Sequence, residues 1–231
     1  FQNLNISGCD VGFETVGSSN ADECIFGFYQ CQSCDVAFKT NDYMNMGFVV
    51  DMVHTIDVNT TFYFYKGGNL VCNRTLVTKA GQTLLKVEDG GNNSSAFVFV
   101  NAKIDGNANN VKIVDDDDSS GALHRIIFQS LHISSGLTGL SATINRSSSL
   151  NGKTFLSIFN GCNLFKLDSA ITIKSGTNYL SGLFVTASDA NASDLLDTSS
   201  GTKYFYKSVG NFDYSGTNGL RADESEGCVS N

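Results

Sequence analysis

Apolar and polar residues alternate along short stretches of this chain. In the first fifteen residues the apolar side chains fall mostly on every second position, with a slip of one residue at Ser7 and Gly8. This alternation predicts a β-strand with one buried face, and the slip predicts a corner between two short strands. A second slip at Gln32 and Ser33 predicts another corner of the same kind.

The alternating pattern recurs along the chain. Residues 1–15 align without a gap with residues 26–40. Cys9 falls on Cys34 in this alignment, and this spacing sets the period of the repeat. The pattern of the first eight residues returns at 128–135, and weaker echoes follow at 155–162, 179–185 and 204–209.

A strand-rich unit of this period predicts a solenoid. We expect an all-β fold, a single-stranded right-handed parallel β-helix of roughly nine coils that forms one domain over residues 1–231. Stacked coils would bring Phe13 to about 4.8 Å from Phe38 in a continuous inward column. Helical repeats are disfavoured because the units are rich in β-branched, aromatic, Gly and Asn residues. The nearest rival fold is a β-sandwich or jelly roll.

The composition limits the partners. The chain has 15 Lys plus Arg against 23 Asp plus Glu, and its net charge of −8 disfavours binding to nucleic acid or an anionic membrane. No apolar run approaches the roughly 18 residues of a membrane span. Because the chain starts at Phe1 with neither an initiator Met nor a signal segment, we expect it to belong to a longer precursor or chain.

N-glycosylation sequons predict exposure to a secretory pathway. A chain this rich in Asn, Ser and Thr also produces many of them by chance. They favour an extracellular or virion-surface location. The sequons lie at Asn5, Asn59, Asn73, Asn92, Asn93, Asn145 and Asn191.

The repeat carries a resemblance to a known superfamily. Residues 4–13 read Leu-x-Ile-x-Gly-Cys-Asp-x-Gly-Phe, and residues 28–38 read Phe-Tyr-x-Cys-x-x-Cys-Asp-x-Ala-Phe. These segments resemble rungs of the pectin-lyase-like right-handed β-helix superfamily, which includes pectate lyases, polygalacturonases, autotransporter adhesins and viral tailspikes. The resemblance implies the fold and a rod that often trimerises, and it leaves the function open.

Aspartates supply the main catalytic hypothesis. Asp10 and Asp35 occupy equivalent outward positions, and Asp57 is expected to continue their column. Like charges about 5 Å apart raise one another's pKa or bind a cation, although exposed aspartates beside turns are the commoner case. The ordered Asn-Thr-Asp, Asp-Asp, Gly-His-Gly and Arg-Ile-Lys elements of polygalacturonases are missing from the sequence.

An acidic run supplies the main metal hypothesis. We interpret it as a loop between two strands, where flexible carboxylates could bind calcium, although such runs are more often solvated turns. No other cofactor is expected. The run consists of Asp115, Asp116, Asp117 and Asp118.

The cysteines are odd in number, so at least one is unpaired or joined to another chain. Cys31 and Cys34 have the spacing of half a zinc site, but no second pair follows, and we expect both to lie in the core. Cys24 and Cys228 are the candidates for disulfides, with partners undetermined. The seven cysteines are Cys9, Cys24, Cys31, Cys34, Cys72, Cys162 and Cys228.

The remaining polar aromatic and imidazole side chains carry weaker signals. His132 matches the outward position of Asn5, and exposure accounts for it. Tyr63 and Tyr65 alternate with Phe residues and could stack on sugar rings, although a strand with an aromatic outer face is the commoner case. The other such residues are His54, His124, Tyr204 and Tyr206.

These features favour a non-enzymatic structural or attachment module of an extracellular or virion-surface fibre or spike. Its partner would be a glycan or a host surface receptor, and we expect a homo-oligomer, such as a trimer. The rival function is a polysaccharide lyase or glycoside hydrolase that uses Asp10 and Asp35.

Overall fold

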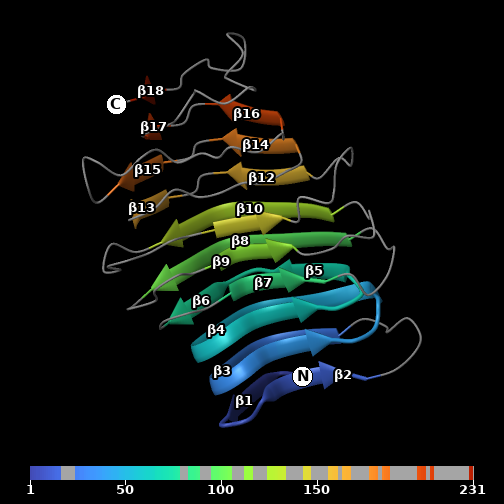
Figure 1. Cartoon of the computed structure of the whole chain (residues 1–231). Coiled ribbons are helices and arrows are strands. Elements are labelled where there is room, and N and C mark those ends of the chain that lie inside the picture. The colour runs from blue at the N-terminus through green and yellow to red at the C-terminus, as the bar shows by residue number, and fades with distance from the viewer. Residues whose placement is uncertain are drawn as a thin grey trace.

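The chain folds into a parallel β-solenoid, with about four turns in its most fully described part (Figure 1). Strand stacks on strand from β1 upward, and every described pairing is parallel. This computed structural model describes residues 1–16, 24–78, 83–88, 95–105, 112–116, 124–133, 143–146, 156–160, 163–167, 177–181, 184–187, 202–206, 209–210 and 229–230.

All the elements of the described residues are strands. The longest of them bend around corners of the coil, while other coils are divided into two or three shorter strands. No helix in the described part of the chain has the length and apolar character needed to cross a membrane. The strands are β1 (Asn3–Ser7), β2 (Val11–Thr15), β3 (Cys24–Thr40), β4 (Met44–Phe64), β5 (Gly68–Cys72), β6 (Thr75–Thr78), β7 (Thr83–Val87), β8 (Ser95–Asp105), β9 (Lys112–Asp116), β10 (His124–Ile133), β11 (Thr143–Arg146), β12 (Leu156–Asn160), β13 (Asn163–Leu167), β14 (Thr177–Ser181), β15 (Phe184–Ala187), β16 (Thr202–Tyr206), β17 (Val209–Gly210) and β18 (Val229–Ser230).

The register confirms the vertical neighbours expected from the repeat. Phe13 of β2 lies opposite Phe38 of β3, and their ring centroids are 6.3 Å apart. The Sγ atoms of Cys9 and Cys34 are 3.3 Å apart. The inward residues of successive rungs therefore form columns, as a parallel ladder requires.

The downstream repeat is confirmed as well. Phe128 of β10 pairs with Phe99 of β8, and Phe99 pairs with Cys72 of β5. Cys72 pairs with Val50 of β4, which pairs with Phe26, and Gly27 donates a backbone hydrogen bond to Phe1. Phe1, Phe26 and Phe128 thus belong to one column of the solenoid. The weaker echoes do not keep this register, because Phe128 pairs with Phe159 whereas Tyr179 pairs with Ile158.

The expectation of a constant period is wrong beyond the first step. Ile6 pairs with Cys31, which is the spacing of the gapless alignment, but Phe38 pairs with Phe62, one residue sooner. Phe99 and Phe128 are also register partners, and they lie further apart in the sequence than either of these two pairs. Coil length varies because corners and connections absorb extra residues. Bulges also shift the register within a pairing, since Met44 of β4 pairs with Gly68 of β5 whereas Phe48 pairs with Leu70.

Left-handed backbone at one corner confirms the slips seen in the sequence. Gly8, Ser33 and Asp57 have φ values of 68°, 52° and 57°, and each directly follows a residue of one in-register column. A residue with positive φ turns the chain sharply, which favours Gly and, among other residues, short polar side chains. These three residues thus form one corner of the coil.

Aromatic rings fill the interior. Phe38 and Phe62 stack with centroids 5.0 Å apart and planes 13° apart, and Phe99 and Phe128 stack at 5.1 Å and 11°. Edge-to-face contacts join these columns across the coil, as between Phe26 and Phe38 at 5.2 Å. The largest buried side chains are Phe26, Tyr29, Phe38, Phe48, Phe62, Phe64, Phe97, Phe99 and Phe128.

Truncation of one stacked ring should destabilise the fold strongly. Phe62→Ala removes a side chain that is 0% exposed and leaves a cavity between two rungs, so we expect a loss of about 3–5 kcal/mol in the free energy of unfolding. Tyr65→Ala is the control, because Tyr65 is 39% exposed, and it should cost less than about 1 kcal/mol. Urea denaturation measures both, and equal losses would contradict this assignment of the core.

Candidate functional site

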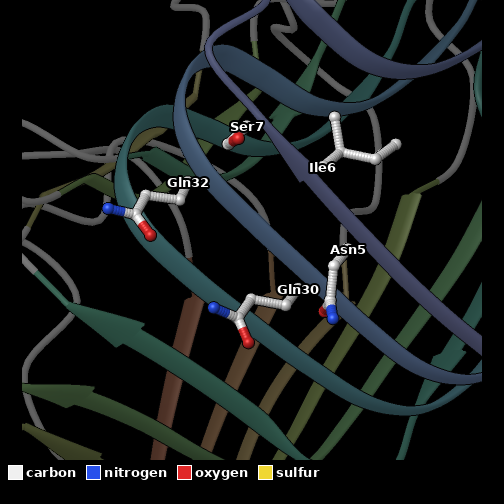
Figure 2. A pocket seen from close by; sticks show the side chains of 5 residues that line it. All are labelled: Asn5, Ile6, Ser7, Gln30 and Gln32. Carbon is white, nitrogen blue, oxygen red and sulfur yellow. The ribbon is translucent and has the colours of Figure 1, made fainter.

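A shallow polar hollow of about 210 Å³ lies on the outer face of β1 and β3. It is lined by Asn5, Ile6, Ser7, Gln30 and Gln32. Figure 2 shows the amide groups of Asn5, Gln30 and Gln32 projecting from their strands, while the side chain of Ile6 points the other way. Ile6 packs against the core, so the polar character of the hollow comes from the other four side chains.

Strand periodicity places these four side chains together. Asn5 and Ser7 are both outward residues of β1, since alternate residues of a strand face the same side. The register sets Asn5 opposite Gln30 and Ser7 opposite Gln32. The hollow is therefore a block of two stacked pairs on neighbouring rungs.

The outward column remains uncharged on the next rung. Gln30 pairs with His54 of β4, which is half-buried. Burial lowers the pKa of His54 below its ordinary value of 6.5, so the imidazole is neutral at pH 7. This column thus offers uncharged hydrogen-bonding groups over three rungs.

The side chains of the hollow can form hydrogen bonds with a ligand. Each amide supplies donors and an acceptor, and each hydroxyl supplies both. The lining contains no carboxylate, thiol or imidazole that could serve as acid, base or strong nucleophile. Such a surface suits a ligand with many hydroxyl groups.

The aspartate column forms only in part. Asp10 and Asp35 are exposed and occupy equivalent positions, because the adjacent residues Val11 and Val36 are register partners. Above Asp35 lies Asn59, whose Nδ2 donates a hydrogen bond of 2.7 Å to Asp35 Oδ1. The expected continuation to Asp57 is wrong, because the register of the next rung sets Asp57 at the left-handed corner.

A second outward column carries charges of both signs. Glu14, Lys39, Tyr63, Lys86 and Asp115 are successive register partners on β2, β3, β4, β7 and β9, and we call them the outer ladder. Lys39 Nζ lies 3.0 Å from Glu14 Oε1. Hydrogen bonds from Lys39 and Asn41 keep the pKa of Glu14 below its ordinary value.

Lysines from both neighbouring rungs approach Tyr63 of the outer ladder. Its ring centroid is 6.0 Å from Lys39 Nζ and 4.8 Å from Lys86 Nζ. Tyr63 Oη donates a hydrogen bond of 2.5 Å to Glu88. Burial and this carboxylate raise the pKa of Tyr63 well above its ordinary range. Because ammonium groups flank its ring, Tyr63 is poorly placed to stack on a sugar.

The other predicted tyrosines fall into two groups. Phe62 and Phe64 are buried, whereas Tyr65 is exposed, which confirms the alternation proposed for this strand. Tyr204 and Tyr206 belong to β16, and Tyr204 pairs with Tyr179 of β14, but their side chains lie outside the described part.

The acidic run is divided by the structure. Asp115 and Asp116 belong to strand β9, so the expectation that the whole run is a loop is wrong, and Asp117 and Asp118 lie outside the described residues. Among the residues that the structure describes, no three His, Cys, Asp or Glu side chains gather closely enough to hold a metal ion.

The core positions expected for two cysteines are confirmed. Cys31 is 0% and Cys34 5% exposed. Cys24 is half-buried, and no disulfide joins any of the five cysteines in the described ranges. Cys162 and Cys228 lie outside those ranges.

The described sequons sit on the surface. Asn5, Asn59 and Asn73 are exposed, and Asn73 Nδ2 donates to Asp51 Oδ1 at 3.5 Å. Asn145 belongs to β11, and its side chain is not described. Asn92, Asn93 and Asn191 lie outside the described residues.

The histidines do not form a site together. His124 is 0% exposed beside Phe97, with centroids 6.3 Å apart. His132 is half-buried and pairs with Lys103, in the same outward column as Gln30 and Asn5. This confirms the position expected for His132.

No protein-family model, curated protein or solved structure matches this chain. The hollow is therefore a candidate site on its geometry alone. No motif in the sequence marks the hollow, although the gapless alignment of the first two coils already sets Asn5 on Gln30 and Ser7 on Gln32.

Acid should weaken the fold partly through the outer ladder. Burial raises the pKa of Glu88, but hydrogen bonds from Lys86 and Tyr63 outweigh it and lower the pKa below 4.5. Glu14 shifts in the same direction, so both carboxylates stabilise the fold above about pH 4.5, and this stabilisation is lost as pH falls through their folded-state pKa values. Urea midpoints should therefore fall less between pH 6 and pH 3 in the Glu14→Gln, Glu88→Gln double variant than in the parent. Equal falls in the two proteins would rule out this contribution.

Proposed function

We propose that this protein is a rigid, non-catalytic recognition module that binds saccharide hydroxyl groups at the hollow of Asn5, Ser7, Gln30 and Gln32. One observation carries the proposal: four uncharged hydrogen-bonding side chains converge in register on neighbouring rungs. Amides and hydroxyls complement the hydroxyl groups of sugars, and this set lacks the groups needed to cleave them.

The solenoid supports binding by holding these groups in place. Backbone hydrogen bonds join β1 to β3 along the whole hollow, so a ligand meets side chains whose positions differ only by rotamer. Four hydrogen bonds worth about 1 kcal/mol each correspond to a dissociation constant in the millimolar range. One hollow alone is thus a weak site.

Weak single sites favour an assembly with several copies. Linking binding sites can raise the overall affinity by about 10²–10⁴ without new contacts. We therefore propose a homo-oligomer, such as a trimer, that presents several hollows to a glycan or host surface receptor. An attachment fibre or spike in the extracellular space or on a virion fits this arrangement.

The finer architecture is part of the proposal. We propose that the solenoid is right-handed, because about 98% of parallel crossover connections within a sheet have that hand. We also propose roughly nine coils and membership of the pectin-lyase-like superfamily. The parallel pairings of β12 with β14 and of β14 with β16 support continued stacking beyond β10.

A polysaccharide lyase or hydrolase is the second candidate. Asp10 and Asp35 support it, since both are exposed on neighbouring rungs. Asn59 engages Asp35 and would have to release it for proton transfer. Cleavage of a surface polysaccharide by the parent, with loss of cleavage in Asp35→Ala, would favour this candidate over the binding module.

Saccharide binding should depend on the hollow. On an array of neutral oligosaccharides we expect the parent protein to bind some of the sugars and to cleave none of them. The double variant Asn5→Ala, Gln30→Ala should bind at least about tenfold more weakly, because it loses two hydrogen bonds. Asn73→Ala, an exposed asparagine away from the hollow, is the control and should bind like the parent. The protein should be produced without glycosylation, because a glycan on Asn5 would occupy the hollow itself. A blank array, or unchanged binding in the double variant, would overturn the proposal.

A further inference from the structure

The first two rungs hold a cluster of three thiols and a phenol. Cys9 lies directly below Cys34, with 3.3 Å between the Sγ atoms. Cys31 and Tyr29 lie beside them, and Tyr29 Oη donates to Ala37 O at 2.9 Å. A Cβ on Gly12 would collide with Tyr29 Oη and lie 3.1 Å from Cys31 Sγ, so glycine keeps this space open. The cluster is thus closely packed and depends on its small residues.

The geometry points to a disulfide between Cys9 and Cys34 that clasps the first two rungs, formed by exchange with a disulfide donor such as oxidised glutathione. Adjacent rungs of a parallel ladder are about 4.8 Å apart, which lies within the Cα separation of about 4.4–6.8 Å that disulfides adopt. The sulfur atoms must approach from 3.3 Å to about 2.0 Å, a movement that side-chain rotation supplies.

The exchange needs one sulfur that the donor reaches and one that resolves the intermediate. Cys9 is half-buried and therefore the more accessible, whereas Cys34 is 5% exposed. Cys9 loses its proton to solvent and attacks the donor as a thiolate, although the hydrogen bond with Cys34 and burial raise the pKa of its thiol. This step forms a mixed disulfide on Cys9 and releases one donor thiol.

Cys34 then completes the reaction. It loses its proton to solvent and attacks Cys9 Sγ, which releases the second donor thiol. The two cysteines lose two electrons and two protons, and the donor disulfide gains them as two thiols. Burial raises the pKa of Cys34, but hydrogen bonds from the Cys9 thiol, the Cys31 thiol and the backbone of Cys9 and Gly8 lower it overall. In the mixed disulfide the bonds from Cys31 and from the two backbone groups remain, and they favour the Cys34 thiolate.

The third thiol is a poorer partner. Burial and its hydrogen bond to Cys34 raise the pKa of Cys31 to about 12, and the side chain is 0% exposed. Cys31 therefore stays protonated and supports the Cys34 thiolate as a donor. Cys72 is buried on a different rung and bonds to Thr75, where its Sγ lies 3.1 Å from Thr75 Oγ1.

Peptide mapping of the full chain tests the clasp. After equilibration with oxidised glutathione, alkylation and chymotryptic digestion, we expect a cross-link between peptides 2–13 and 30–38, which end at Phe13 and Phe38. Cys31→Ser should retain this cross-link, and Cys34→Ser should abolish it, which separates the two cysteines of peptide 30–38. Cys72→Ser is the control and should leave it unchanged.

Thermal denaturation supplies a second measurement. Oxidation should raise the Tm of the parent by roughly 5–10 °C, because the clasp closes a loop of about 25 residues, and it should not raise the Tm of Cys9→Ser. Absence of the 2–13 to 30–38 cross-link in the oxidised parent would overturn the inference. So would a bond between Cys31 and Cys34, or a cross-link that survives in Cys34→Ser.

Discussion

The parallel backbone ladder between successive rungs is the constraint on which the rest of this structure depends. It fixes neighbouring coils about 4.8 Å apart, so each side chain rests on the residue at the equivalent position of the next coil. Columns of Phe gain from this arrangement, since Phe38 stacks on Phe62 and Phe99 on Phe128. The same proximity gives columns of like charge an electrostatic cost. The outer ladder avoids this repulsion between Glu14 and Lys39, because these neighbours have opposite charges and form an ion pair.

Variation in coil length enters at corners and connections and also at bulges within the ladder, such as the register shift between Met44 and Phe48 of β4. Few residues separate the register partners Val53 and Thr75 along the chain, whereas many more separate Ile127 and Ile158. The added residues enter corners and connections, whose conformation does not have to match the rung below. Columns of inward residues therefore continue through the solenoid even though the sequence period changes.

This variation explains which features could be predicted from the sequence. The stacking of Cys9 on Cys34 and the corner at Gly8 and Ser33 were predictable, because the first two coils have equal length and align without a gap. Asp57 was placed wrongly because the register of the next rung sets Asn59 at the position of Asp35, so Asp57 falls two residues earlier, at the left-handed corner. The hollow was missed for a different reason, since Asn5 and Gln30 are ordinary polar residues alone and form a site only when stacked.

The ladder also favours a particular chemistry for recognition. Two like charges about 5 Å apart repel by about 1 kcal/mol even in water, and the cost grows with every rung added to the column. Amides and hydroxyls carry no net charge, so Asn, Gln and Ser can be stacked on consecutive rungs without that penalty. An outer face that repeats hydrogen-bonding groups is therefore best built from these residues, and Asn5, Ser7, Gln30 and Gln32 follow this rule. Under the proposed function, a repetitive polar ligand such as a glycan matches such a face better than a highly charged ligand does.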